Sequence, residues 1–566
     1  MFETLPPAFI MFAGAVLIGV SRAATRSAIV LLTPLVALYA VWLVPDGASV
    51  SLPFLTYDIE VVEGGALRRL FATVFCIMAF AGGLFALRQA RWYELSAAFA
   101  YAGGAIGVAF AGDLIALFLF WEMMALFSAL LIWCGHTERS RAAGIRYIAM
   151  HLLGGILLKV GIEGWYGHAG SLEMQPLPLD NIGAWLILVG ILINAAAPPV
   201  SAWLADAYPE ASPSGAVLLS AFTTKTAVLA LILLFPGAEV LIWVGLYMVF
   251  YGIIYAALEN DMRRILAYSI VNQVGFMVCA VGIGTDMALN GAAAHAFAHI
   301  LYMPLLLMSA GSVLYMTGRR KCSDLGGLFR SMPLTCICGI IGALSISAFP
   351  LTSGFVTNSM IAGAAGEGNL AVVWFMLMAA SAGVFLHAGL KFPWFVFFQN
   401  DSGLRPPDPP WNMRAAMVFL SILCIGIGVL PGPLYQLLPF DAEYVPYNGG
   451  HLVAYSQLLL FSGLGFFSLL PLMKQTETIS LDWDWFWRRG GLAFLRWATR
   501  QWNAGFAALE GGLRGGARAA IGSVYALTGP DSAIGRHLRT GSAVLFATTI
   551  LGVILVLVLV IPELNG

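Results

Sequence analysis

The sequence predicts an all-α polytopic membrane protein with about sixteen transmembrane helices, each needing roughly 20 apolar residues to cross the bilayer. The chain has 566 residues, of which 60% are hydrophobic and only 10% are charged, and its mean hydropathy is +0.85. Soluble domains carry about 25% charged residues, so a soluble fold could not bury this much apolar surface. The net charge of −1 gives no indication of nucleic-acid binding.

Apolar spans follow one another along the chain, with boundaries uncertain by several residues. They lie near residues 5–20, 27–44, 68–87, 92–110, 113–134, 144–166, 183–200, 214–235, 238–258, 264–284, 287–316, 333–365, 370–398, 411–430, 451–472 and 540–562. The predicted segments are N-terminal helices (1–91), a first five-helix repeat (92–258), a second five-helix repeat (259–400), additional helices (401–479), an amphipathic lateral helix (480–538) and a C-terminal transmembrane helix (539–566).

The distribution of basic residues predicts the orientation of these spans. Among the 29 Lys and Arg, Arg68 and Arg69 flank a span on one side, and Lys159, Lys225 and Lys391 lie inside apolar segments. If successive spans cross the membrane in alternating directions, all the other basic residues fall in loops or helix ends on the opposite side. By the positive-inside rule that side is cytoplasmic, so both termini are expected outside a bacterial plasma membrane.

Two spans contain prolines that predict broken helices. One reads ILINAAAPPVSAWLADAYPEAS, with Pro198 and Pro199 inside it, and the other reads ALSISAFPLTSGF, with Pro350. A proline removes a backbone donor and clashes with the preceding turn. Paired breaks in corresponding halves are typical of inverted repeats and of ion paths in transporters. Ordinary proline kinks are the alternative.

The segment 480–538 interrupts the run of apolar spans. It mixes Trp, Phe and Leu with regularly spaced Arg, which is typical of an interfacial amphipathic helix. Glycine pairs at 490–491 and 515–516 are expected to interrupt this helix. Two interpretations remain open: a linker to the final span, or a lateral brace packed along other helices.

The sequence offers no motif for a metal or cofactor. Its seven Cys are scattered, without a C-x-x-C or a paired Cys/His spacing. It also lacks a Walker A motif and a dinucleotide fingerprint. We therefore expect no metal and no cofactor, and energy for transport must come from an ion gradient or from partner subunits.

Two ionisable residues stand in the middle of predicted spans. Glu122 lies in FLFWEMMALFSALLIW, and Lys225 lies in SAFTTKTAVLALILL. An ionisable residue within a membrane is a candidate functional site by default, because burying its charge is costly. A facing Glu122–Lys225 pair could exchange a proton when a neighbouring charge moves. The alternative is a static structural ion pair.

Other polar residues occur in pairs spaced i,i+4, which places them on one helix face. His295 and His299 are candidates for proton relay or for a satisfied core pair. His387 and Lys391 repeat the spacing near a span end, where Lys391 could instead extend to the interface. Lys159 and Glu163 fit a structural ion pair better.

These segments resemble the proton-translocating membrane subunits of Mrp-type Na⁺/H⁺ antiporters and of respiratory NADH dehydrogenase, with the closest likeness to the D-type antiporter proteins. The matching stretches, in order, are GDLIALFLFWEMM, WLADAYPEASPSGAVLLSAFTTKTAVLAL, MRRILAYSIVNQVGF, HAFAHILYMPLLLMSAGSV and SISAFPLTSGFVTNSMI. The resemblance implies two inverted five-helix repeats and a central axis of Glu, Lys and His residues.

The family's polar axis carries over only in part. Glu122 matches the glutamate of span 5, Lys225 the lysine of span 8, and His295 and His299 the histidines of span 11. Neutral residues occupy three other positions that are usually ionisable in the family: Asn194, Met303 and Asn358. The resemblance therefore implies a proton axis that is incomplete at these three positions.

The leading functional hypothesis is a subunit of a multi-subunit monovalent cation (Na⁺)/proton antiporter, not itself an enzyme, with a curtailed proton path. The second is a membrane-arm subunit of a NADH dehydrogenase-like or hydrogenase-like redox complex, and the third is a non-transporting scaffold subunit. Expected partners are the other subunits of such a complex, protons, monovalent cations and the lipid bilayer. The sequence identifies neither the cation nor the neighbouring subunits.

Overall fold

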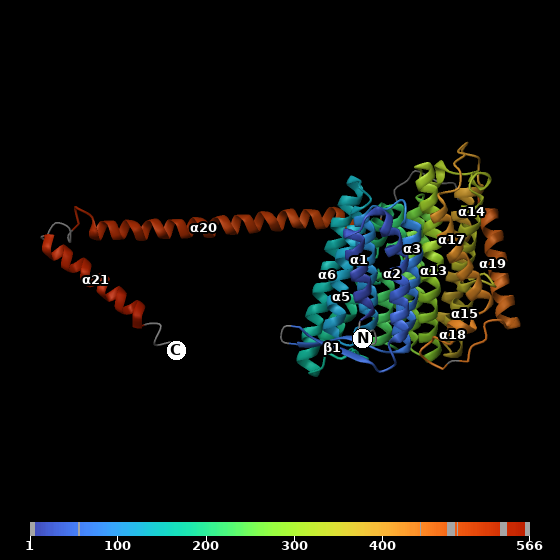
Figure 1. Ribbon diagram of the computed structural model, residues 1–566, viewed down its shortest axis with the longest axis horizontal. Coiled ribbons are helices and arrows are strands. Elements are labelled where there is room, and N and C mark those ends of the chain that lie inside the picture. The colour runs from blue at the N-terminus through green and yellow to red at the C-terminus, as the bar shows by residue number, and fades with distance from the viewer. Residues whose placement is uncertain are drawn as a thin grey trace. The chain divides into compact units, whose positions relative to one another are not determined.

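A computed structural model describes residues 6–54, 57–441, 443–471, 482–483, 485–532 and 540–560. The chain divides into two compact units, 1–484 and 485–566. The first is a helical bundle with long, roughly parallel helices (Figure 1). Its α-helices are α1 (Pro7–Val20), α2 (Ala23–Leu43), α3 (Ala66–Ala86), α4 (Trp92–Phe110), α5 (Leu114–Trp133), α6 (Glu138–Ala169), α7 (Ile182–Asn194), α8 (Ala202–Ala207), α9 (Pro213–Leu219), α10 (Thr223–Leu234), α11 (Val240–Leu258), α12 (Met262–Ile283), α13 (Asp286–Thr317), α14 (Pro333–Ile346), α15 (Ser353–Glu367), α16 (Ala371–Val384), α17 (Trp411–Val429), α18 (Gly432–Tyr435) and α19 (Gly449–Leu469).

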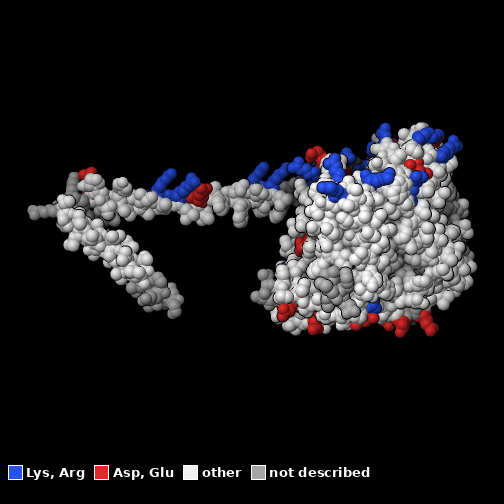
Figure 2. Space-filling view, in the orientation of Figure 1, with Lys and Arg blue, Asp and Glu red and all other residues white. Residues whose placement is uncertain are grey.

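The helices are long and apolar enough to account for a membrane protein. Twelve of the helices in the described ranges meet the length and hydropathy expected of a span, and α1, α7 and α14 are shorter apolar helices. The helices α12 and α13 and the pair α9–α10 are almost wholly buried, so they form the centre of the bundle. In Figure 2, Lys and Arg gather at one end of this bundle, where some Asp and Glu accompany them, and the charged residues visible at the other end are mostly Asp and Glu.

The acidic loop after α2 contains a β-hairpin that the sequence interpretation missed. Strand β1 (Ser49–Phe54) pairs antiparallel with β2 (Tyr57–Glu63), with Leu52 opposite Ile59 and a shift in register after Val50. Strand β1 alternates polar and apolar residues, and in β2 the apolar Ile59, Val61 and Val62 are buried. Within the described ranges, the regular secondary structure is therefore helical apart from this hairpin.

Both proline-marked spans are interrupted as predicted. Helix α7 ends at Asn194 and α8 begins at Ala202, with Pro198 and Pro199 between them. Helix α14 ends at Ile346 and α15 begins at Ser353, with Pro350 between them.

A third interruption was not expected. The predicted continuous span near 214–235 is divided into α9 and α10, and Ser220 to Phe222 separate the two helices. This stretch contains no proline, so its sequence gives no local signal for a break.

The predicted span near 370–398 also departs from a regular helix, because two π-helical segments follow α16: η5 (Phe385–Lys391) and η6 (Trp394–Phe398). Short 3-10 helices complete the unit: η2 (Tyr208–Glu210), η3 (Cys322–Asp324) and η4 (Leu328–Arg330).

The second unit contains two long helices and one π-helical turn. These are η7 (Phe486–Gly491), α20 (Leu492–Thr528) and α21 (Thr540–Val560). Arg side chains project from one side of α20 (Figure 2), as expected of an amphipathic helix. The prediction that the glycine pair at 515–516 interrupts this helix was wrong, because α20 runs through it. Glycine weakens a helix by about 1 kcal/mol relative to alanine, which the flanking Ala, Leu and Arg offset.

Candidate ion-translocation site

Lys225 lies at the break between α9 and α10 and is 0% exposed. Its Nζ donates to the carbonyl oxygen of Ser220 at 2.6 Å and to Oγ1 of Thr224 at 3.0 Å. A backbone carbonyl released by a helix break needs a new partner within a membrane. The ammonium group therefore completes the backbone at this break.

Tyr101 of α4 also binds backbone and side-chain groups at this break. Its hydroxyl accepts from the backbone N–H of Thr223 at 3.0 Å and lies 2.6 Å from Oγ1 of Thr223. It also lies 3.4 Å from the carbonyl oxygen of Leu219. Together, Tyr101 and Lys225 satisfy groups on both sides of the break, which explains how it persists without a proline.

Glu122 is half-buried on α5 and faces α6. A Cβ added to Gly155 would clash with Oε1 of Glu122, so the carboxyl group lies directly over this glycine. Within the described ranges, Oε1 has no hydrogen-bond partner, and Glu122 forms no ion pair with Lys225. The structure thus gives no direct contact for the proposed Glu122–Lys225 pair, in either its working or its static form, and an exchange through water stays a prediction.

His295 on α13 is held between two neighbouring helices. Its Nδ1 lies 2.9 Å from Oγ1 of Thr357 on α15, and its Nε2 lies 2.9 Å from Oε1 of Gln273 on α12. The Gln273 oxygen only accepts, so Nε2 carries a proton. The Thr357 hydroxyl can either donate to a neutral Nδ1 or accept from a protonated one, because Ser353 O lies 3.1 Å away as an alternative acceptor. His295 can therefore change charge with only a rotation of one hydroxyl.

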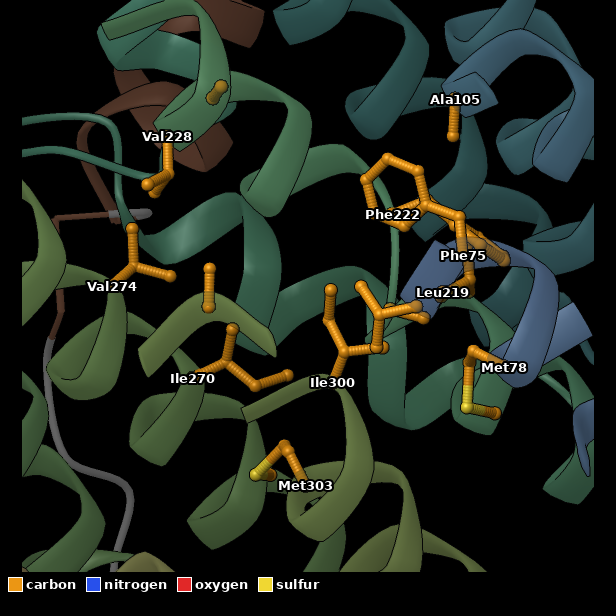
Figure 3. Close-up of a cluster of buried hydrophobic side chains, with 14 of the residues drawn as sticks. Phe75, Met78, Ala105, Leu219, Phe222, Val228, Ile270, Val274, Ile300 and Met303 are labelled. Atoms are coloured by element: carbon orange, nitrogen blue, oxygen red, sulfur yellow. The ribbon is translucent and has the colours of Figure 1, made fainter. Parts of the chain in front are cut away.

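His299, one turn further along α13, is in a different environment. It is 0% exposed, and neither ring nitrogen has a hydrogen-bond partner among the described residues. The Tyr302 ring lies edge-on to it at 5.2 Å. The next turn carries Met303, which is also 0% exposed and lies in a cluster of buried hydrophobic side chains with Ile270 and Ile300 (Figure 3).

Lys391, in the π-helical segment η5, caps another helix. Its Nζ donates to the carbonyl oxygens of Ala256 at 3.1 Å and of Ala257 and Glu259, both at 2.6 Å. These carbonyls end α11, where a cation is favoured by the helix dipole. Lys391 is 1% exposed, so its ammonium binds these carbonyls and not solvent. His387 donates from Nδ1 to Gly383 O at 2.8 Å, and its Nε2 has no partner in the described part of the chain.

The three neutral positions of the axis differ in their surroundings. Asn358 on α15 accepts from the hydroxyls of Tyr455 at 2.9 Å and Ser381 at 3.3 Å, which ties α15 to α19 and α16. Asn194 is 3% exposed, and within the described ranges its Oδ1 has no partner. Met303 supplies only an apolar side chain. None of the three can carry a proton charge.

Other candidate groups have ordinary structural roles. Lys159 and Glu163 form the expected i,i+4 ion pair on the half-exposed side of α6. All seven Cys are buried and free. No group of three or more His, Cys, Asp or Glu with the spacing of a metal site occurs within the described ranges.

One buried histidine was missed by the sequence interpretation. His151 on α6 is 1% exposed and stacks against the Tyr147 ring at 3.9 Å between centroids. A single histidine within the apolar stretch IAMHLLGGILL was the available signal. It has no Lys, His, Asp or Glu four residues away, which is the spacing that marks the other pairs.

Comparisons with known proteins agree with this fold. Residues 111–386 match the protein family described as NADH:quinone oxidoreductase/Mrp antiporter, transmembrane. The A/B-type component of a probable K⁺/H⁺ antiporter from Rhizobium meliloti is 29% identical over 64% of this chain and 40% of its own length. The D-type component of a Na⁺/H⁺ antiporter from Alkalihalophilus pseudofirmus is 30% identical over 51% of this chain and 64% of its own length. The chain thus spans less than two thirds of either antiporter relative.

A relative from respiratory complexes is matched over a larger share of its length. The N-type component of NADH-quinone oxidoreductase from Desulforudis audaxviator is 30% identical over 58% of this chain and 71% of its own length. Among solved structures, a chain of the Mrp complex from a Dietzia species has a TM-score of 0.69 at 21% identity, covering 82% of this chain and 98% of its own. A chain of the archaeal membrane-bound sulfane sulfur reductase has a TM-score of 0.72 at 22% identity, covering 98% of this chain and 100% of its own. The chain therefore belongs to the family of NADH:quinone oxidoreductase and Mrp antiporter transmembrane subunits.

Proposed function

We propose that this chain is a proton-translocating subunit of a multi-subunit monovalent cation/proton antiporter in a bacterial plasma membrane. The observation that carries the proposal is Lys225, a fully buried lysine at a helix break with no carboxylate bonded to it in the described part of the chain. An intramembrane ionisable group without a structural ion partner is a site for ion transfer by default. Two antiporter components are among the relatives of this chain.

The geometry at Lys225 suits a group that gains and loses a proton. An ammonium has three donors, and two of them are used by Ser220 and Thr224. The third donor is available to water or to an incoming proton acceptor. His295 can also change charge in place, so the chain offers one exchangeable group near the break and one on the central helix α13.

The path is proposed to be curtailed beyond these groups. Asn194, Met303 and Asn358 cannot hold a proton charge, and the apolar cluster around Met303 borders His299 along α13. A proton path needs protonatable groups or ordered water at each step, and a thioether offers almost no hydrogen bonding. We therefore expect little proton flux past His299, so other subunits would complete the antiport cycle.

The test is proton movement in everted membrane vesicles that contain the native complex. Lys225→Ala should abolish most of the cation-dependent ΔpH while the complex still assembles, because it removes the exchangeable group. Lys159→Ala is the matched control, since it removes a lysine of α6 that is 37% exposed and already paired with Glu163. Wild-type activity in Lys225→Ala would refute the proposal and favour the scaffold role.

A membrane-arm subunit of a redox-driven complex is the second candidate. It is favoured by the NADH-quinone oxidoreductase relative, 71% of whose length is covered. Purification of the tagged chain from its native membrane separates the two. Small antiporter subunits in the purified complex would support the first candidate, and iron–sulfur and flavin subunits would support the second.

A further inference from the structure

One turn of α6, from His151 to Gly155, meets three neighbouring helices. The His151 ring lies edge-on to the Trp203 ring of α8, with 4.7 Å between centroids. A Cβ on Gly154 would lie 3.3 Å from the Ile193 side chain of α7, and one on Gly155 would clash with the Glu122 carboxyl of α5. The two glycines therefore let α5 and α7 approach this turn closely.

The hydrogen bond of His151 fixes its tautomer. Nδ1 lies 3.2 Å from the carbonyl oxygen of Tyr147. A carbonyl oxygen only accepts, so Nδ1 carries the proton and Nε2 of the neutral ring is a bare acceptor. The Tyr147 ring stacks on the imidazole, the Trp203 ring lies edge-on to it, and these two rings also contact each other, so the three rings pack as one cluster that holds the imidazole in this orientation.

Buried atoms without partners gather around this turn. Nε2 of His151, Oε1 of Glu122 and Oδ1 of Asn194 are all buried, and none has a hydrogen-bond partner within the described ranges. Asn194 directly follows Ile193, whose carbonyl oxygen accepts from Nε1 of Trp203 at 2.9 Å. Buried polar atoms in native proteins are nearly always satisfied by protein or by ordered water. Three unsatisfied acceptors near one helical turn indicate bound water there.

Apart from Glu122, the acidic groups on the elements that pack against α6 already have partners. Asp206 of α8 binds Arg146 of α6 at 2.6 Å, and Glu210 of η2 binds Arg320 at 2.7 Å. Helix α7 carries no ionisable residue, and the remaining ionisable groups facing this part of α6 are the phenols Tyr147 and Tyr208. Glu122 is the one carboxyl group of α5, and it lies against Gly155, one turn from His151.

We propose that Glu122 and His151 form a buried proton-binding site, bridged by ordered water, in the first half of the bundle. This inference deepens the proposed function and rests on it. In the transfer step, the Glu122 carboxylic acid releases a proton to the bridging water, which passes one of its own protons to Nε2 of His151. The products are a carboxylate and an imidazolium, so charge and atoms balance, and the reverse transfer restores the starting state. His151 thus supplies a basic group on the turn of α6 that packs against Ile193, which directly precedes Asn194.

The test follows the protonated carboxyl band of Glu122 by infrared difference spectroscopy on the purified native complex. Glu122→Gln should remove the band and thereby identify it. Loss of the imidazolium partner disfavours the carboxylate, so His151→Gln should move the pH midpoint of the band upward by about one unit. His168→Gln is the matched control, because His168 lies on the same helix but is exposed. A midpoint in His151→Gln equal to that of the control would overturn the proposal.

A second variant tests the same site without touching either titrating group. Gly155→Ala places a methyl group where the Glu122 carboxyl lies, so the carboxyl must move away from α6 and the midpoint should again rise. An unchanged midpoint in this variant argues against the site even where His151→Gln fails to assemble. Transport in vesicles separates the two proposals. If the pH midpoint rises in the variants but the native complex shows no cation-dependent proton movement, the site stands and the antiporter function is refuted. If the midpoint is unchanged in the variants and transport by the native complex is normal, the site alone is refuted.

Discussion

At the scale of single residues, the buried ionisable groups differ mainly in how their hydrogen bonds are completed. Lys391 uses all three Nζ donors on the carbonyls that end α11. Lys225 uses two, and one remains for exchange. The two lysines are equally buried, so burial alone does not distinguish a helix cap from a transfer group. The number of hydrogen-bond acceptors that Nζ binds does distinguish them.

Met303 gives a prediction at the same scale. Met303→Lys places an ammonium among buried hydrophobic side chains, and an unpaired buried ion costs several kcal/mol. The purified complex should therefore melt at a markedly lower temperature, or the variant should fail to assemble. Met303→Leu is the control, because a volume-conserving apolar exchange usually costs less than about 1.5 kcal/mol. Wild-type stability in Met303→Lys would mean that water reaches this position.

The residues of the site could be predicted only in part. Glu122, Lys225 and the His295–His299 pair stand out because charged or paired polar residues are rare in apolar spans. Their partners could not be foreseen. Gln273 and Thr357 are ordinary polar residues on other helices, and no sequence pattern indicates that their side chains contact His295. His151 was missed because its significance depends on Trp203 and Glu122, which are distant in sequence.

At the scale of helices, the three breaks show what local sequence can and cannot specify. Pro198 and Pro350 mark two breaks directly, because proline removes a backbone donor. The break at 220–222 depends instead on Tyr101, which lies more than a hundred positions earlier in the chain. Such a break is a tertiary feature, and a pattern-based interpretation assigns the segment to one continuous helix.

The role of Tyr101 can be tested at this scale. Tyr101→Phe removes the hydroxyl that accepts from the buried N–H of Thr223. A buried donor left unpaired costs about 1–3 kcal/mol, so the melting temperature of the complex should fall and transport that depends on Lys225 should weaken. Tyr93→Phe is the control, since the Tyr93 hydroxyl binds His136 at an exposed position. Equal melting temperatures for the two variants would show that the break does not need this bond.

At the scale of the whole molecule, the separation of charge between the two ends of the bundle predicts its orientation. Lys and Arg gather at one end in Figure 2, and such an end faces the cytoplasm in most membrane proteins. A reporter fused after Gly318 should therefore signal from the cytoplasm, and one fused after Gly170 should signal from outside. Signals from the same side would invalidate the order of the spans between these two glycines.

The bond between Lys225 and Ser220 also has a consequence for how the molecule moves. A neutral amine still has two donors, which is the number that the Ser220 carbonyl and the Thr224 hydroxyl require. The backbone at the break therefore keeps both hydrogen-bond partners in both charge states, although the bonds from the ammonium are the stronger ones. Proton exchange at Lys225 need not be a mechanical event: the electrostatic field inside the bundle changes, while the helices around it keep their shape.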